Sequence, residues 1–163
     1  MNSTATPLDR AFAALSYVMP LTSALGAGMY FLPFLERTAP PLAQLLALLL
    51  FPLSPLIAIE SNPILGLGIF ILLFAFVVRN ENISRFIRFN VLQAILVSFL
   101  ISIGILILDL LGLTRTALLG EALLNVFFLG GMAIVVYSVA QSVLGRYAEI
   151  PTISDAVNMQ MPY

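Results

Sequence analysis

The sequence predicts an all-α, polytopic integral membrane protein: a bundle of four transmembrane helices with one proline-broken segment that is re-entrant or interfacial. Hydrophobic residues make up 61% of the 163 residues and charged residues only 9%, and the mean hydropathy is +1.07. So few charges cannot cover the surface of a soluble domain of this length. The apolar residues also occur in runs long enough to cross a bilayer, which takes about 20 residues.

The first helix is expected over residues 12–31, within a single membrane domain that covers 1–163. The first ten residues, which precede this apolar run, carry one Asp and one Arg, and no signal-peptide cleavage site follows the run. We therefore interpret the run as a retained helix and not as a signal peptide. Pro20 is expected to kink it. A face of small residues suits close helix packing. This face comprises Ser23, Ala24, Ala27 and Gly28.

The segment over residues 41–60 is apolar, but it is interrupted by prolines. Leu42–Leu50 is strongly helical in character, and Pro52 and Pro55 then follow. Each proline removes a backbone donor and crowds the preceding turn. We therefore expect this segment to be broken, and to be re-entrant or to lie at the interface instead of crossing the membrane.

Three further helices are marked by end signals. Asn62 before Pro63 predicts the start of a helix over 63–79, which is short for a span at 1.5 Å per residue. The last two helices are expected over 85–111, capped by Ser84, and over 118–145, ended by Gly145.

The C-terminal tail, residues 146–163, is neither low in complexity nor highly charged, so disorder is not indicated. Ile150, Ile153 and Val157 are expected to lie against the membrane or the bundle.

The arginines indicate the orientation. With four spans, five of the seven arginines lie on the side of both termini, which is then cytoplasmic or its equivalent. If all five apolar runs span, the N-terminus lies outside and the count is again five to two. Arginine counting does not separate these topologies, and Pro52 and Pro55 favour four spans.

The composition excludes several kinds of site. The chain has no His and no Cys, which excludes thiol catalysis, disulfides, haem ligation and the usual zinc sites. The carboxylates are scattered, so we expect no metal centre and no cofactor. The basic residues form no aromatic-interleaved face of the kind that binds nucleic acid. We expect a protein that is not an enzyme.

Polar side chains within the apolar runs are the candidate functional residues, because such groups are costly in a membrane. They fall in pairs on helix faces at spacings of three or four. The pairs are Asn90 and Gln93, Glu121 and Asn125, and Ser138 and Gln141. They either line a conduit or partner surface, or form interhelical hydrogen bonds worth about 0.6 kcal/mol each. The absence of a charge deep in any run favours hydrogen bonding.

A basic, aromatic-rich loop precedes the helix over 85–111. Its arginines are Arg79, Arg85 and Arg88. They suit anchoring to anionic headgroups, at about 1 kcal/mol for each arginine, and they also suit docking of a partner.

Two segments resemble a known family. Val77–Asn80, continued by Ile83–Asn90 and Gln93–Leu96, is similar to the signature of the Tic-twenty family, a small membrane subunit of the translocon at the inner envelope of chloroplasts. Tyr147–Val157, with Met159 and Gln160, resembles the C-terminal end of its cyanobacterial branch. The resemblance extends over about residues 8–160 and is specific in these two segments.

The resemblance implies four membrane helices, with both termini on the stromal or cytoplasmic side. No transit peptide is indicated, which suggests a bacterial, plastid-encoded or already processed chain. Of these we expect a cyanobacterial chain, in the plasma or thylakoid membrane. It implies a role in preprotein translocation or insertion, and a contribution to a protein-conducting channel. It supplies no catalytic residues and no cofactor. The expected partners are membrane lipids, other membrane subunits, further copies of the chain and translocating polypeptides, but not nucleic acid.

Two other functions compete with translocation. The chain is also suited to be a structural or assembly subunit of a larger membrane complex, for example a photosynthetic one. A small-molecule transporter is disfavoured by the absence of a deep charge and of an inverted repeat. Four helices this apolar cannot enclose a pore for a polypeptide, so a channel would need several copies or other subunits.

Overall fold

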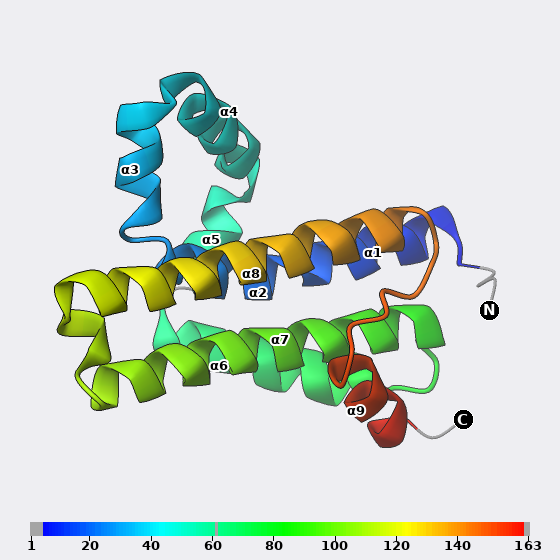
Figure 1. Cartoon of the computed structure of the whole chain (residues 1–163). Helices are drawn as coiled ribbons and strands as arrows, with labels where there is room; N and C mark the ends of the chain where they lie inside the picture. Colours follow the sequence, from blue (N-terminus) through cyan, green and yellow to red (C-terminus); the bar gives the residue numbers. More distant parts are fainter. Residues whose placement is uncertain (1–4, 61, 162–163) are drawn as a thin grey trace.

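The computed structural model describes residues 5–60 and 62–161, which form helices and turns and contain no strand. Four helical segments, two of which consist of two consecutive helices, lie side by side as a bundle (Figure 1). They are α1 (Pro7–Ser16) with α2 (Val18–Ala27), α6 (Pro63–Leu72) with the π-helix η2 (Leu73–Val78), α7 (Arg85–Leu110), and α8 (Ala117–Val143). A short 3-10 turn, η3 (Leu113–Arg115), joins α7 to α8, and α9 (Ile153–Gln160) follows α8.

The first helix begins at Pro7, before the predicted start at residue 12, because a capping box at Thr6 and Asp9 extends it. The Thr6 hydroxyl accepts from the Asp9 backbone N–H at 3.2 Å, and the Thr6 N–H donates to Asp9 Oδ2 at 2.9 Å. The helix axis continues from Pro7 to Ala27, whereas the sequence predicts residues 12–31. A turn at Tyr17 separates α1 from α2, three residues before Pro20, which has no N–H to donate to the preceding turn.

A helical excursion connects α2 to α6 and stands away from the bundle (Figure 1). It consists of α3 (Phe31–Thr38), α4 (Pro40–Leu50), the 3-10 turn η1 (Phe51–Leu53) and α5 (Ser54–Glu60). The bend between the first helix and α3 is 78°. None of the residues in these four elements is buried. The break predicted at Pro52 appears as the tightened turn η1, after which α5 returns to α2.

The structure confirms the predicted class, an all-α polytopic membrane protein. Within the described residues, three helices are long and apolar enough to cross a membrane: Pro40–Glu60, Arg85–Leu110 and Leu118–Val143. A fourth span results if Pro7–Ala27 and the bent continuation Phe31–Thr38 count as one. The number four is therefore approximate.

Either the shorter apolar helix Ile64–Val78 or the segment Pro40–Glu60 can be counted as the remaining transmembrane helix. Ile64–Val78 lies along α7 within the bundle, whereas α3 and α4 lie across the bundle direction (Figure 1). If the bundle axis is the membrane normal, α3 lies close to the membrane plane. The arrangement thus favours Ile64–Val78 as a bundle helix, with flanking residues that reach the interface.

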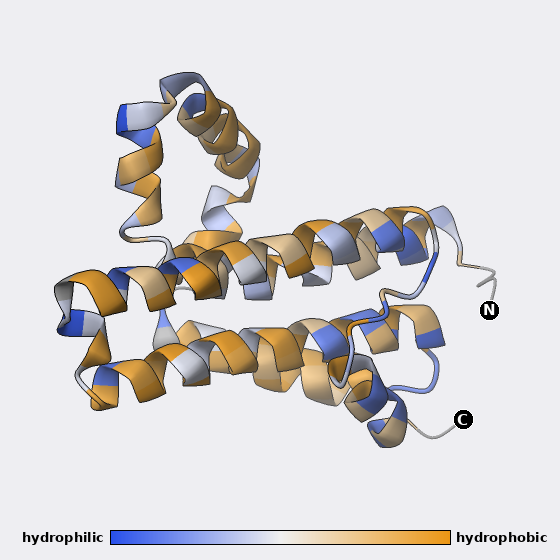
Figure 2. Ribbon diagram, in the orientation of Figure 1, coloured by the Kyte–Doolittle hydropathy of each residue, from blue (hydrophilic) through white to orange (hydrophobic). Residues whose placement is uncertain are grey.

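The bundle is mainly apolar along the middle of its helices, with hydrophilic residues gathered toward the ends (Figure 2), and it exposes many large apolar side chains on α7 and α8. Its interior is closed by side chains that are almost fully buried, among them Ala24, Leu92, Val97 and Ile101. This pattern fits helices that contact lipid outside and one another inside.

Candidate functional site

A buried polar network lies between the helices at the end of the bundle where α1 and α7 begin. Asn90 and Gln93 are both 0% exposed. The Tyr17 hydroxyl donates to Asn90 Oδ1 at 3.0 Å and accepts from Gln93 Nε2 at 3.0 Å. The Ser142 hydroxyl also donates to Asn90 Oδ1, at 3.1 Å, and Asn90 Nδ2 donates to the Phe86 carbonyl at 2.8 Å. These bonds connect the first helix, α7 and α8.

Gln93 extends this network to the C-terminal segment, residues 146–161. Its Nε2 donates to the Ala148 carbonyl at 3.1 Å, and its Oε1 accepts from the Ser154 hydroxyl at 3.0 Å. Ser154 in turn accepts from the Ile150 backbone N–H at 2.7 Å. One buried glutamine thus holds both the segment that follows α8 and the start of α9.

Apolar contacts fix the same C-terminal segment against the bundle. The Tyr147 ring packs edge-on against Phe86 and Phe89, with centroids 5.2 and 4.9 Å away. Val157 is fully buried and Ile150 is 8% exposed, so both lie against the bundle. The segment therefore covers this end of the bundle instead of extending into solvent.

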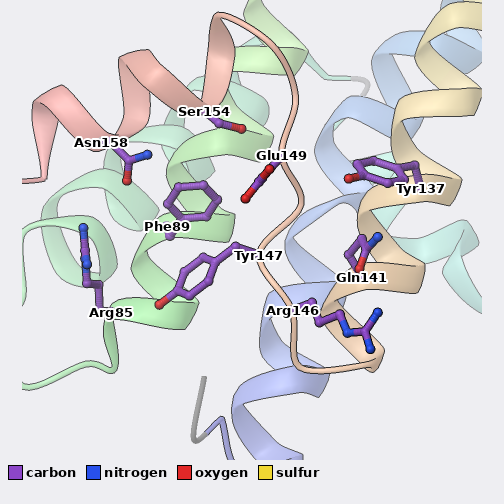
Figure 3. A pocket seen from close by; sticks show the side chains of 9 residues that line it. All are labelled: Arg85, Phe89, Tyr137, Gln141, Arg146, Tyr147, Glu149, Ser154 and Asn158. Atoms are coloured by element: carbon purple, nitrogen blue, oxygen red, sulfur yellow. The ribbon is translucent and has the colours of Figure 1, made fainter. Parts of the chain in front are cut away.

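A polar hollow of about 470 Å³ lies beside the C-terminal segment (Figure 3). It is lined by Arg85, Phe89, Tyr137, Gln141, Arg146, Tyr147, Glu149, Ser154 and Asn158. In Figure 3 the segment passes between Arg85 on one side and Gln141 and Arg146 on the other. The two arginines therefore face different parts of the hollow and do not form a single anion clamp.

The predicted polar residues do not gather on one face. Asn90 and Gln93 meet in the network, while Glu121 is exposed in the half of α8 that is remote from it. Three buried side-chain oxygens have no hydrogen-bond partner within the described residues: Asn125 Oδ1, Ser138 Oγ and Gln141 Oε1. Of these residues, Gln141 lines the hollow.

The three predicted loop arginines have separate surroundings. Arg88 is half-buried, and its Nε donates to the Val78 carbonyl at 2.8 Å, which satisfies a carbonyl at the end of η2. Arg79 and Arg88 line one small hollow with Gln160, whereas Arg85 lines the larger hollow. Arg79 and Arg85 are exposed.

Sequence reasoning missed Glu60, which ends an apolar run. The structure places it in a cavity with residues from the middle of α2 and α7. The only sequence signal for this cavity is a pair of serines that also line it, Ser98 and Ser102, spaced four apart in α7. Among the described residues, no three His, Cys, Asp or Glu side chains are grouped to hold a metal.

The alkaline stability of the fold should depend on Tyr147. Burial raises the pKa of its phenol above the ordinary value of 10.0, despite the opposing charge of Arg85. The folded state then holds the proton more tightly than the unfolded state, so this contribution is full below about pH 10 and is lost as the pH rises through the folded pKa. Tyr147→Phe should therefore lose less stability than the wild type between about pH 9 and 11. Thermal unfolding at both pH values measures this, and equal losses would contradict it.

Comparisons with known proteins agree on one family. The model of the family described as "Chloroplast import apparatus Tic20-like" matches residues 6–157. A Tic20 family protein of Synechocystis sp. is 44% identical over 165 residues, covering 99% of this chain and 98% of the relative. Protein TIC 20-II, chloroplastic, of Arabidopsis thaliana is 30% identical over 165 residues, covering 97% and 75%. The Tic20 family protein Ycf60 of Gracilaria tenuistipitata is 35% identical, covering 96% and 76%. The chain belongs to the Tic20-like family of the chloroplast import apparatus.

Proposed function

We propose that this protein is a non-catalytic subunit of a membrane machinery that translocates or inserts proteins. The observation that carries the proposal is the match to the Tic20-like family over residues 6–157, nearly the whole chain. The apolar bundle, with several helices long enough to span a membrane, supports a role inside the bilayer. Membrane lipids and other membrane subunits are the partners that such a surface requires.

A channel, in this proposal, is built from several copies or together with other subunits. The bundle interior is filled by buried side chains from α2, α7 and α8. A single copy leaves no open path for an extended polypeptide between these helices. Any translocating chain would instead contact outward faces, and both the α3–α4 hairpin and α8 expose large apolar side chains.

We further propose a cyanobacterial plasma or thylakoid membrane as the location, with both termini in the cytoplasm. The 44% identity to the Synechocystis protein supports the cyanobacterial assignment. The beginning of α1 and the end of α9 lie at the same end of the bundle (Figure 1). The positive-inside tendency makes the arginine-rich end the cytoplasmic one.

The alternative function is that of a structural or assembly subunit of a larger membrane complex. The buried network favours this assembly function, because Asn90 and Gln93 form their hydrogen bonds with other parts of the same chain. These two residues then act in packing and provide no polar lining for a conduit.

Site-specific photo-crosslinking in native membranes separates the two functions. Probes belong at Leu48 on α4 and Val136 on α8, which are 70% and 62% exposed, with buried Val97 as the control position. Translocation predicts adducts with precursor or nascent polypeptides at one or both exposed positions, lost when precursor synthesis stops. Adducts only with resident membrane subunits would contradict translocation and favour the assembly function.

A further inference from the structure

A hollow of about 330 Å³ lies beside the end of η2 and the first turns of α7. Its polar lining comes from the loop after η2, from α7 and from the end of α9: Arg79, Glu81, Arg88 and Gln160. The rest of its wall consists of three apolar side chains, Phe74, Val78 and Leu92. The hollow thus combines two arginines with an apolar wall.

The Arg88 guanidinium is held in place at this hollow. Its Nε donates to the carbonyl of Val78, the last residue of η2, at 2.8 Å. This bond uses one of the five N–H donors of an arginine. The other four have no acceptor within the part of the chain that the structure describes. Arg88 is therefore oriented by the protein and still able to bind an oxyanion.

Arg79 supplies a second guanidinium group to the same hollow. It is exposed, directly follows the apolar helix Ile64–Val78, and its side chain forms no hydrogen bond or ion pair with the described residues. Glu81 lines the hollow too, but it forms no ion pair with either arginine. Two guanidinium groups and one carboxylate give the hollow one net positive charge. The charge balance therefore matches a single monoanion.

Phenyl rings lead from the hollow along α6 and α7. Phe74 lines the hollow, and the centroid of its ring lies 6.0 Å from that of Phe70. The Phe70 ring in turn lies 4.9 Å from Phe99, in the middle of α7. All three side chains are partly exposed, Phe99 by 38%. An apolar strip therefore begins at the basic hollow and runs toward the middle of the bundle.

We propose that this hollow binds one monoanionic membrane lipid, with its phosphodiester or sulfonate group between Arg79 and Arg88 and an acyl chain along Phe74 and Phe70. Arginine binds such oxyanions through its planar fork of donors, and basic pockets between membrane helices take up anionic headgroups. Neither a soluble anion nor an apolar ligand alone would use both the arginines and the strip of rings. This site does not depend on the proposed function.

The structure distinguishes this site from general attraction of arginines to an anionic surface. Arg85 belongs to the same basic segment as Arg79 and Arg88, but it lines the other hollow, beside Tyr147 and Asn158. Loss of its charge should therefore leave the lipid site intact. Arg79 is the sharpest position to change, because its side chain has no bond within the described residues that a substitution would break.

Thermal unfolding of the full-length, delipidated protein in detergent tests the proposal. Phosphatidylglycerol should raise the unfolding midpoint saturably, because the lipid binds only the folded state, and phosphatidylcholine at the same mole fraction should not. Arg79→Gln should shift the titration to about tenfold higher phosphatidylglycerol. Arg85→Gln removes the same charge and should keep the wild-type titration. Glycerophosphoglycerol, the same headgroup without acyl chains, should give no rise at equal concentration.

Mass spectrometry of the intact protein, released from detergent under non-denaturing conditions, counts the bound lipid directly. The wild type should retain about one phosphatidylglycerol per chain, as should Arg85→Gln, while Arg79→Gln and Arg88→Gln should lose it. Equal effects of phosphatidylglycerol and phosphatidylcholine would overturn the proposal, and so would equal losses in Arg79→Gln and Arg85→Gln. A rise with glycerophosphoglycerol equal to that with the lipid would show that a free phosphodiester is the ligand.

Discussion

Replacing Gly131 with leucine should force α2 and α8 apart and destabilise the bundle by about 3 kcal/mol, or prevent folding. A Cβ atom on Gly131 would lie 2.8 Å from Ala24 Cβ and 2.9 Å from Ile101 Cδ1. Ala24 is fully buried and Ile101 is 2% exposed, so neither side chain has free space to occupy. Small residues at this contact allow the two helix backbones to approach closely.

The matched control is Gly130→Leu, one residue earlier in α8. A Cβ atom on Gly130 would meet no atom within 4 Å, and the position is exposed. Both variants add the same side chain to the same helix, so propensity effects cancel. Thermal unfolding in detergent measures the difference. Equal stability of the two variants would show that the α2–α8 contact does not depend on the glycine.

The second large effect is expected for Gln93→Ala, which should cost about 2–3 kcal/mol. The substitution removes three hydrogen bonds and leaves the Ala148 carbonyl and the Ser154 hydroxyl without this partner. Since Gln93 is fully buried, the shorter side chain also leaves a cavity. The C-terminal segment should detach first, which trypsin cleavage after exposed Arg146 reports.

Gln141→Ala is the control for this experiment. Gln141 is also a glutamine at the same end of the bundle, but its Oε1 has no hydrogen-bond partner within the described residues. The same truncation should therefore cost less than half as much and leave the cleavage rate after Arg146 close to that of the wild type. Similar losses in both variants would mean that the Gln93 network does not hold the C-terminal segment.

Two local signals in the sequence coincide with helix starts in the structure. The cap at Asn62, followed by Pro63, marks the start of α6, and Ser84 marks the start of α7. Apolar composition predicted the class, because a bilayer imposes helices on such runs. The first helix was placed too late because Thr6 and Asp9 form a capping box outside the apolar run.

The contacts between distant residues could not be predicted in the same way. Tyr17 and Asn90 are 73 positions apart, and nothing local to either residue indicates that they meet. Nothing in the sequence near Glu60, which directly follows an apolar run, indicates that it lies beside α2 and α7. Its position in the structure depends on the 78° bend that sends the chain away from the bundle and on the return through α5.

The most direct test of the membrane architecture is the accessibility of single cysteines introduced at Asn62 and Asn82, in a chain that has no cysteine of its own. Ile64–Val78 lies between the two positions. If this short helix crosses the membrane as part of the bundle, an impermeant thiol reagent should reach Asn62→Cys and Asn82→Cys from opposite sides. Labelling of both from the same side would contradict the account, and Pro40–Glu60 would then replace Ile64–Val78 among the spans.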